Sequence, residues 1–517
     1  MFTRTIVAVA VAALATAGAA TATASPPPDE VTFAAAGVED DGADCPVTLP
    51  GSLTANSRLP DPFTKIDGTR VTAKSQWRCR RAEIKQLAER YVYGEKPPKP
   101  SSVTGTVSSS NITVNVSHNG RNASFSASVQ LPNGSGPFPA VVVLGGFGAD
   151  TATIRAAGAA VIDYDPLAVG REGTPRNNKQ GAFYTLYGAT SSTGLLAAWS
   201  WGVSRIIDVI EQSGGNVLRA DATGVTGCSR YGKGAFAAGA FDQRIALTMP
   251  IESGSAGAPV FRGLQGESGA QPLSSAYGEQ PWLGDAFSSF TANPANLPVD
   301  THEVVGMIAP RGLFIMENPH VDWLGARSGS VAALGGAEVY KALGAGGNIS
   351  YWSDVQDGTH CASRSEWRTP LQQSIQRFLV GTGSAPAVFR ISSRKAGDLS
   401  EWRTWQTPTL SDGPPTDPPP AAGCTATASV SQWTGGFVAT VRVTAGSSPV
   451  AGWTVTTALP SGTRIVNAWE ATRSADTGTV TFTNVGHNGA VAAGQSVEFG
   501  FQGSGTGTGM TPACAAR

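Results

Sequence analysis

The 517-residue chain has few charged residues, and the charges of the two signs nearly cancel. Lys, Arg, Asp and Glu make up 15% of the residues, and the formal net charge at pH 7 is -1. Nucleic acids and anionic membrane surfaces bind proteins that have a surplus of Lys and Arg. The composition therefore indicates that neither nucleic acid nor a membrane is a partner of this protein.

The sequence also lacks the motifs of a zinc site, because neither a CxxC nor an HxxxH spacing occurs in it. Structural and catalytic zinc sites take Cys and His ligands at short, regular spacings. We therefore expect no metal and no other cofactor. After residue 24 the sequence also lacks any apolar run long enough to span a bilayer.

Residues 1–24 have the pattern of a secretory signal peptide. Arg4 precedes an apolar, Ala-rich run that ends in the small residues Ala22-Thr23-Ala24, as at a signal-peptide cleavage site. A membrane anchor is the alternative, but the run is short and polar, Pro-rich sequence follows it. We expect cleavage after Ala24 and a secreted, extracellular protein.

Six cysteines in an exported chain favour disulfides. Two of them bracket the C-terminal part of the chain, two lie near the mature N-terminus, and two remain. The pairs expected from these positions are Cys45 with Cys79, Cys228 with Cys361, and Cys424 with Cys514. Two buried free thiols are the alternative for the pair that remains.

Changes in composition predict two folded domains. We expect a disordered segment over 25–43, an α/β domain over 44–404, a Pro-rich linker over 405–423 and a β-domain over 424–514. In the first domain, continuous apolar runs alternate with helical stretches, which is typical of a parallel sheet covered by helices on both faces. In the second, short runs alternate at period two between glycine turns, as in a β-sandwich.

The segment "VTGCSRYGKGA", residues 225–235, places Ser229 between an expected strand and an expected helix. In α/β-hydrolases the nucleophilic serine lies on such a turn, which holds its hydroxyl above the sheet. The usual pattern is G-x-S-x-G, whereas here one more residue separates Ser229 from Gly232. This segment alone is equally compatible with a nucleophile and with an ordinary glycine-rich turn.

A serine nucleophile requires a histidine base and a carboxylate that orients it. His360 lies in a loop before the last expected helix of the first domain, where α/β-hydrolases place the base. Glu252 follows the next strand after Ser229, so the chain order of the three residues matches that of these enzymes. A disulfide between Cys228 and Cys361 would bring Ser229 and His360 together. We therefore expect an α/β-hydrolase three-layer sandwich.

Two basic residues after Ser229 have more than one interpretation. Hydrolases use the backbone N–H of the residue after the serine in the oxyanion hole, which is Arg230 here, and its guanidinium would add a charged donor. A surface salt bridge is the alternative for Arg230. Lys233 lies one turn further along the expected helix, where it either contacts an anionic or hydroxyl-rich substrate or is solvated.

The stretch "GCSRYGKGAFAAGAFDQRIALTMPIESG" resembles the glucuronoyl esterases of carbohydrate esterase family 15, whose motif is G-C-S-R-x-G-K-G-A. The resemblance covers nearly the whole first domain, with further similar stretches at "CPVTLPGSL", "EQPWLG", "APRGLFIMENPHVDWLG" and "DGTHC". It implies that Ser229 is the nucleophile, His360 the base, Glu252 the orienting acid and Arg230 a stabiliser of the oxyanion.

The same resemblance implies a site for the glucuronate ring. The residues that match its positions are Lys233, Gln271, Glu279 and Trp323. Some bacterial members of the family take the acid from a later strand end. On that pattern Glu317 and Asp322 in "MENPHVDW" are the alternatives to Glu252.

The second domain resembles family 2 carbohydrate-binding modules, on stretches such as "CTATASVSQWTGGFVATVRVT" and "SVEFGFQGSGTG". Such modules bind cellulose through a row of exposed tryptophans, and some prefer xylan. Trp433 and Trp469 match two positions of the row, and His487 stands at the third in place of an aromatic residue. The alternative is that both tryptophans are half-buried sandwich residues. Trp453 lies in an apolar strand and is expected in the core.

These features predict a secreted, monomeric 4-O-methyl-glucuronoyl methylesterase. The resemblance implies hydrolysis of the ester between 4-O-methyl-D-glucuronic acid side chains of glucuronoxylan and lignin alcohols. The second domain would hold the enzyme on cellulose or xylan. Two alternatives stay open: an acetyl-xylan or broad carbohydrate esterase, and a polysaccharide-binding protein with an inert hydrolase domain. All three triad residue types are present, which argues against an inert domain.

Overall fold

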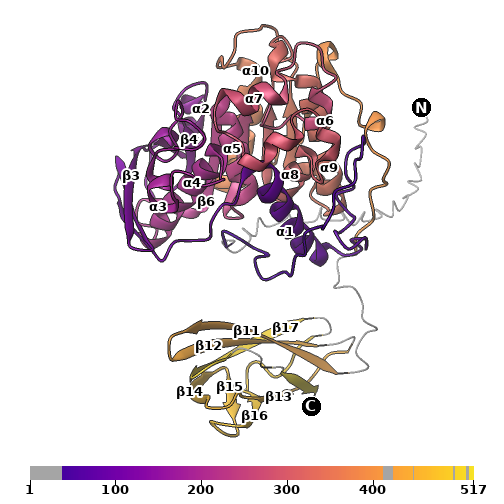
Figure 1. Ribbon diagram of the computed structural model, residues 1–517. Coiled ribbons are helices and arrows are strands. Elements are labelled where there is room, and N and C mark those ends of the chain that lie inside the picture. Colours follow the sequence, from indigo (N-terminus) through magenta and orange to yellow (C-terminus); the bar gives the residue numbers. More distant parts are fainter. Residues whose placement is uncertain are drawn as a thin grey trace, which may run out of the picture. The chain divides into compact units, whose positions relative to one another are not determined.

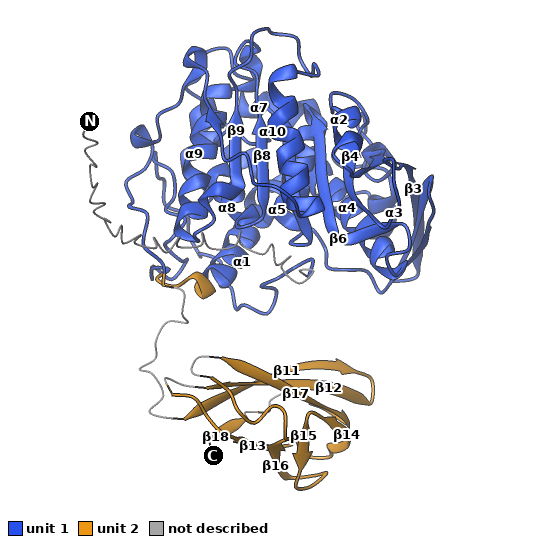
Figure 2. Ribbon diagram, turned by 180° about the vertical axis from the view of Figure 1, so that it is seen from behind, with its two compact units in different colours: residues 1–71, 77–410 blue, residues 72–76, 411–517 orange. Residues whose placement is uncertain are grey.

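The computed structural model (Figure 1) describes residues 38–411, 423–445, 448–492, 495–507, 510 and 512–516. The expected signal peptide and most of the expected linker lie outside the described residues. The chain divides into two compact units, coloured blue and orange in Figure 2. The first unit consists of residues 1–71 and 77–410, and the second of residues 72–76 and 411–517.

The first unit is built on one ten-stranded sheet with the strand order β1-β2-β3-β5-β4-β6-β7-β8-β9-β10. The first three strands and the pairing of β3 with β5 are antiparallel, and every pairing from β5 to β10 is parallel. The strands are β1 (Ser102–Val107), β2 (Asn111–His118), β3 (Arg121–Gln130), β4 (Phe138–Leu144), β5 (Ala160–Tyr164), β6 (Leu218–Cys228), β7 (Ile245–Ile251), β8 (Gly312–Met316), β9 (Ile349–Trp352) and β10 (Phe389–Arg390).

Helices cover both faces of this sheet (Figure 1). Successive side chains of β4 point to opposite faces of the sheet, and both faces are apolar. Val142 and Leu144 belong to one hydrophobic core, and Val141 and Val143 belong to another. Side chains of α4, α5 and α8 complete the first core, and side chains of α2 and α10 complete the second. The helices are α1 (Trp77–Ala88), α2 (Thr151–Ala156), α3 (Ala182–Tyr187), α4 (Leu195–Gln212), α5 (Arg230–Phe241), α6 (Phe261–Leu264), α7 (Leu273–Glu279), α8 (Thr301–Ile308), α9 (Ala326–Ala342) and α10 (Ser365–Ile375). The predicted three-layer α/β-hydrolase sandwich is confirmed.

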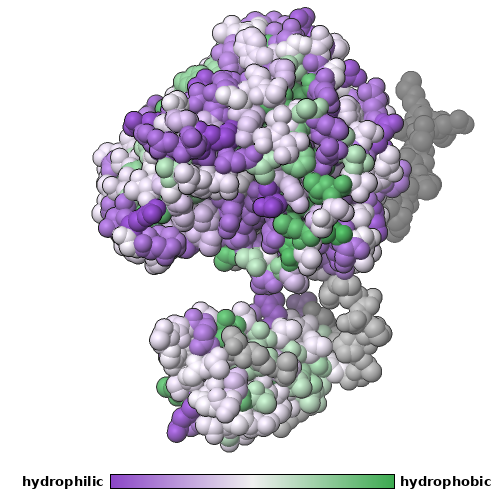
Figure 3. Space-filling model, in the orientation of Figure 1, coloured by the Kyte–Doolittle hydropathy of each residue, from purple (hydrophilic) through white to green (hydrophobic). Residues whose placement is uncertain are grey.

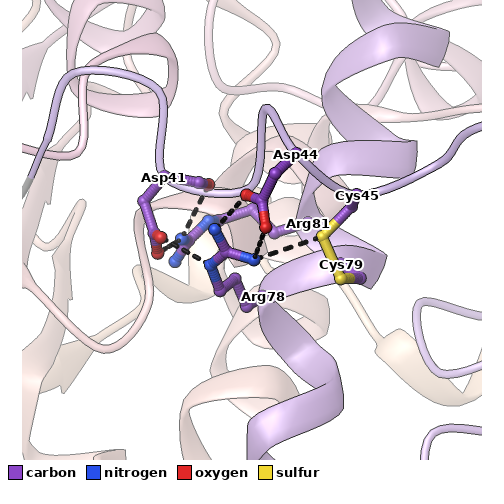
Figure 4. Close-up of a disulfide and its surroundings, with 6 residues drawn as sticks. All are labelled: Asp41, Asp44, Cys45, Arg78, Cys79 and Arg81. Atoms are coloured by element: carbon purple, nitrogen blue, oxygen red, sulfur yellow. Dashed lines mark hydrogen bonds and ion pairs between the residues drawn. A yellow bond between two sulfur atoms is a disulfide. The ribbon is translucent and has the colours of Figure 1, made fainter. Parts of the chain in front are cut away.

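A disulfide and a group of ion pairs attach the N-terminal segment to α1 (Figure 4). Cys45 is bonded to Cys79 in the first turn of the helix. Asp41 accepts a hydrogen bond of 2.6 Å from Nε of Arg78, and it also pairs with Arg81. The segment before Cys45 is therefore held by charge as well as by the covalent bond.

The attachment extends into residues that we expected to be disordered. Of the expected disordered segment 25–43, residues 38–43 are described and the rest lie outside the described residues. Glu39 forms ion pairs with Lys96 and Arg205, whose side chains are buried. Acidic residues in a polar stretch resemble a solvated tail in sequence, and only the buried cations of the folded domain give them partners.

The other end of the first unit also extends beyond its expected boundary at residue 404. Trp405 and Leu410 are buried and belong to the larger hydrophobic core of the unit. Trp405 packs edge-on against Phe63, with ring centroids 5.8 Å apart. Residues 405–410 therefore pack as part of the folded unit, although their sequence reads as the start of the linker.

The second unit contains two four-stranded antiparallel sheets, with the orders β11-β12-β17-β14 and β15-β16-β13-β18. Phe437, Phe499 and Trp453 lie in the core between them and are almost completely buried. This confirms the predicted β-sandwich, and Cys424 is bonded to Cys514. The strands are β11 (Cys424–Trp433), β12 (Gly436–Ala445), β13 (Trp453–Ala458), β14 (Arg464–Trp469), β15 (Ala471–Arg473), β16 (Thr479–Asn484), β17 (Ser496–Ser504) and β18 (Ala513–Ala516).

The visible surface of the first unit is a mosaic of hydrophilic and intermediate residues, with small hydrophobic areas between them (Figure 3). This pattern is ordinary for a folded domain, in which scattered exposed apolar residues require no special explanation. In the described part of the chain, no helix combines the length and the apolar composition that crossing a bilayer requires.

Candidate active site

Ser229 occupies the sharp turn between β6 and α5. Its backbone has φ 59° and ψ -125°, a conformation that costs free energy for any residue with a Cβ. The turn is held on both sides, because N–H of Ser229 donates to the carbonyl of Ile251 and its own carbonyl accepts from Lys233, at 2.9 and 3.0 Å. This is the strained strand-to-helix geometry of a hydrolase nucleophile.

Glu252 follows β7, the strand beside β6, and its carboxylate contacts the ring of His360. Nδ1 of His360 donates to Oε2 of Glu252 at 2.6 Å, and N–H of Cys361 donates to the same oxygen at 2.8 Å. The other oxygen of Glu252 has Nδ2 of Asn318 at 3.4 Å and Nε of Arg364 at 3.7 Å. Glu252 is fully buried, so these contacts fix its orientation. With Nδ1 protonated and engaged, Nε2 of His360 is left as the basic nitrogen.

The Cys228–Cys361 disulfide joins the residue before Ser229 to the residue after His360, with Cα atoms 5.9 Å apart. Gly148 packs directly against it, because a Cβ at this position would lie 2.5 Å from Cβ of Cys228. The two loops that carry the serine and the histidine are therefore tied together. Each of the three disulfides joins the pair of cysteines that their positions in the sequence suggested.

The two alternative acids have different surroundings. Glu317 is fully buried, and its Oε1 accepts a hydrogen bond of 3.4 Å from Oγ of Ser253. Burial and the charge of Glu252 raise the pKa of Glu317 to about 8. Asp322 is exposed and pairs with Lys395 at 3.2 Å. Of the three carboxylates, Glu252 is the one in hydrogen-bond contact with His360.

Arg230, at the first position of α5, has a side chain that is 40% exposed. It forms an ion pair with Glu172, with Nη1 and Oε2 2.8 Å apart. The structure therefore shows an ion pair for this residue, which was the alternative interpretation, and the role of the guanidinium at the oxyanion stays a prediction.

Lys233 is buried, although its sequence position left open whether it is solvated. Its Nζ donates to the carbonyl oxygens of Ser253 and Ser255 at 2.5 and 2.7 Å. Burial lowers the pKa of Lys233 to about 8, while nearby Glu279 acts in the opposite direction. Burial disfavours the charged form of Lys233, while the two carbonyl acceptors hold its ammonium group in place.

The other three residues expected to bind the sugar ring lie next to one another. Nε2 of Gln271 donates to Oε2 of Glu279 at 2.8 Å, and the backbone N–H of Gln271 donates to the carbonyl of Trp323 at 3.1 Å. Trp323 is 54% exposed and its ring lies edge-on to that of His360, with centroids 5.9 Å apart. A polar and aromatic surface thus adjoins the histidine.

The second unit presents Trp433 and Trp469 to solvent, with exposures of 46% and 41%. Trp433 ends β11 and Trp469 ends β14, the two edges of one sheet. The indole of Trp469 lies over Gly500 of β17, where a Cβ would come within 2.3 Å of the ring. Nε2 of His487 lies 2.5 Å from Oε2 of Glu470, the residue that follows Trp469. Both tryptophans are therefore available for stacking on a sugar.

Comparison with known proteins identifies the family. The family described as "Glucuronyl esterase, fungi" matches residues 114–344. The "4-O-methyl-glucuronoyl methylesterase" of Hypocrea jecorina is 38% identical over 378 residues, which cover 72% of this chain and 80% of that protein. This chain belongs to the glucuronoyl esterase family.

Solved structures of glucuronoyl esterases are similar to this chain in sequence and in fold. A serine-to-alanine mutant of the enzyme from Sporotrichum thermophile, in complex with methyl 4-O-methyl-β-D-glucopyranuronate, is 37% identical with a TM-score of 0.67, covering 71% of this chain and 100% of that chain. A carbohydrate esterase family 15 enzyme from Caldicellulosiruptor kristjansonii is 32% identical with a TM-score of 0.59, covering 69% of this chain and 98% of that chain.

The second unit matches the family described as "Cellulose binding domain" over residues 424–516. The predicted resemblance to a carbohydrate-binding module is confirmed by this match. Together with the three disulfides, it indicates an extracellular protein.

Reasoning from the sequence missed three residues that support the site of this family member. Asn318 and Arg364 contact Glu252, and Glu172 contacts Arg230. Each lies in a loop far along the chain from its partner, and although Asn318 belongs to the family-like stretch "APRGLFIMENPHVDWLG", no contact with Glu252 follows from that stretch. The one available signal was the position of Asn318 just after a buried strand, where functional side chains of parallel sheets gather.

Proposed function

We propose that this protein hydrolyses esters of 4-O-methyl-D-glucuronic acid, the reaction for which its relatives are named. Its natural substrate in this proposal is the ester that links glucuronic acid side chains of glucuronoxylan to lignin alcohols. The observation that supports it most is the contact of 2.6 Å between His360 and the buried carboxylate of Glu252. This pair lies beside the strained turn of Ser229, in a chain of the glucuronoyl esterase family.

In the proposed mechanism, Oγ of Ser229 attacks the carbonyl carbon of the ester and gives its proton to Nε2 of His360. Glu252 holds the ring and stabilises the imidazolium that forms. The carbonyl oxygen becomes an oxyanion, stabilised by a backbone N–H of the turn and by the guanidinium of Arg230. When the tetrahedral intermediate collapses, His360 protonates the departing alcohol, which leaves a glucuronoyl ester on Ser229.

Water completes the cycle. His360 removes a proton from the water as it attacks the glucuronoyl-serine carbonyl, and then returns a proton to Oγ of Ser229. The products are 4-O-methyl-glucuronic acid, still attached to its xylan chain, and the free alcohol. General-base and oxyanion contributions each amount to orders of magnitude in rate.

Four residues would bind the uronate ring in this proposal. Lys233 and Glu279 supply a donor and an acceptor for ring hydroxyls, Gln271 supports Glu279, and Trp323 offers an apolar face beside His360. An acetyl esterase has no use for such a surface, because its acyl group carries no hydroxyls. This difference favours the uronate ester over an acetyl ester as the substrate.

The second unit would hold the enzyme on cellulose or xylan through Trp433 and Trp469, with His487 contributing at a third position. Stacking of a flat aromatic row on sugar faces requires exposed indoles, and both are exposed. The proposal also includes secretion after cleavage at Ala24, and a monomer.

The test is to offer the purified wild-type protein benzyl glucuronate and acetylated xylan side by side. We expect free benzyl alcohol from the first substrate and no acetate from the second. Release of acetate without turnover of the uronate ester would reassign the protein as an acetyl esterase. No activity on either substrate would favour an inert, polysaccharide-binding domain.

A further inference from the structure

We propose that Glu172 is a positioning residue for the reaction, which holds the guanidinium of Arg230 beside the nucleophile while the oxyanion forms. This inference rests on the proposed function, in which Arg230 is a donor to the oxyanion. Glu172 belongs to no motif that the sequence analysis singled out.

Arg230 needs such a partner, because 40% of its side chain is exposed to solvent. A long, exposed arginine samples many rotamers, and ordering it during the reaction would cost free energy each time. Preorganised donors avoid this cost, which is why oxyanion sites are rigid.

Glu172 can order Arg230 because a buried residue of the protein holds the carboxylate of Glu172 in place. Its side chain is only 11% exposed, and Oε1 accepts a hydrogen bond of 2.6 Å from Nε1 of Trp282. Trp282 is buried, with 2% of its surface exposed. Oε2 of Glu172 then accepts from Nη1 of Arg230 at 2.8 Å. One carboxylate thus connects a buried indole to the exposed guanidinium.

The ion pair with Glu172 leaves N–H donors of the Arg230 guanidinium available for the substrate. An arginine has five N–H donors in a planar fork, and Glu172 is bonded to one terminal nitrogen. The centre of the guanidinium also lies 5.8 Å from the ring centroid of Trp282, at the favourable distance for a cation over an aromatic face. The carboxylate and the indole therefore restrict the fork while other donors remain for the substrate.

An ordinary surface ion pair looks different in the same chain. Arg327 and Glu401 lie 3.1 Å apart, with side chains that are 49% and 54% exposed. Such pairs contribute little, because solvent screens them and both side chains must be ordered. This pair provides a matched control for the loss of one charged contact away from the site.

A structural role is the competing explanation. The loop of Glu172 is joined to the segment of Glu279, since N–H of Gly173 donates to Oε1 of Gln280 at 2.7 Å. Arg176 of the same loop donates to the carbonyl of Leu283 at 2.6 Å. A disturbed loop would therefore weaken sugar binding and raise KM, whereas a misplaced Arg230 would lower kcat.

The experiment compares wild type with Glu172→Gln, Arg230→Ala, the double variant and the control Glu401→Gln. For each protein, kcat and KM are measured on benzyl glucuronate, and Tm is measured to check folding. Glutamine keeps the shape of Glu172 and an oxygen that can accept from Trp282, but it loses the charge. We expect kcat of Glu172→Gln to fall roughly 3- to 10-fold, with KM nearly unchanged. Arg230→Ala stays measurable, because removing one oxyanion donor costs roughly 100- to 1000-fold.

The double variant decides between the two explanations. If Glu172 acts through Arg230, Glu172→Gln has no further effect on kcat in the Arg230→Ala background, and Glu401→Gln has no effect at all. The same loss in both backgrounds, a rise in KM alone, or no loss would overturn this inference. An inactive wild type would instead contradict the proposed function, so the two failures are distinguishable.

Discussion

The disulfide between Cys228 and Cys361 should stabilise the fold and also keep Ser229 and His360, the proposed nucleophile and base, together. Replacing both cysteines with alanine removes a cross-link that closes 133 residues, whereas the Cys45–Cys79 disulfide closes 34. The chain-entropy relation gives about 5 kcal/mol of stabilisation for the longer loop and about 4 kcal/mol for the shorter one. The two double variants should therefore lose similar amounts of stability.

Their activities should differ. The Cys228–Cys361 disulfide flanks Ser229 and His360, and a displacement of about 1 Å between catalytic groups can cost about 100-fold in rate. We expect kcat on benzyl glucuronate to fall by about that factor in the Cys228→Ala/Cys361→Ala variant. The Cys45→Ala/Cys79→Ala variant should keep its kcat at temperatures where it is folded.

The assay measures kcat at a temperature well below the Tm of both variants, so that unfolding does not contribute. Equal, unchanged kcat values in the two variants would refute the reasoning, because the histidine loop would then be positioned without the disulfide. Equal losses of kcat would refute it as well, since they would show a general effect of lower stability.

Glu252→Gln should lower kcat about 10⁴-fold, because glutamine stabilises the wrong tautomer of His360. Glu317→Gln should keep kcat within about twofold of wild type, because the raised pKa already keeps the carboxyl of Glu317 neutral near pH 7. In the folded protein Glu317 keeps its proton up to about pH 8, whereas in the unfolded chain it loses the proton near pH 4.5. The free energy of unfolding of wild type should therefore fall relative to that of Glu317→Gln as the pH rises from 4.5 to 8. Urea titrations of both proteins across this pH range measure the difference. Replacing Trp433 and Trp469 together with alanine should abolish retention on a cellulose column. The control Thr472→Ala, on the other sheet, should be retained like wild type. Retention of the tryptophan variant would place the binding surface elsewhere.

The sequence could predict the parts of the site that depend on local order along the chain. Ser229 lies on a turn that its neighbours dictate, and the positions of Glu252 and His360 follow from where parallel strands end. What the sequence could not predict are contacts between loops that are distant along the chain. Glu172 meets Arg230 across 58 residues, and no periodicity records such a contact.

The same limit explains the differences at the edges of the first unit. The acidic residue Glu39 reads as part of a solvated tail, but it pairs with buried cations that only the folded domain brings together. Trp405 lies in a stretch of loop-like composition and is buried by packing against Phe63. Lys233 was ambiguous for a related reason, because helical periodicity does not tell which neighbouring loop covers a side chain.

The most direct test of the account is to quench the reaction with benzyl glucuronate during turnover and to identify the modified peptide by mass spectrometry. The mechanism predicts a glucuronoyl adduct on Ser229, and neither adduct nor turnover in a folded Ser229→Ala variant. Hydrolysis of the ester by Ser229→Ala at the wild-type rate would contradict the central claim that this serine is the nucleophile.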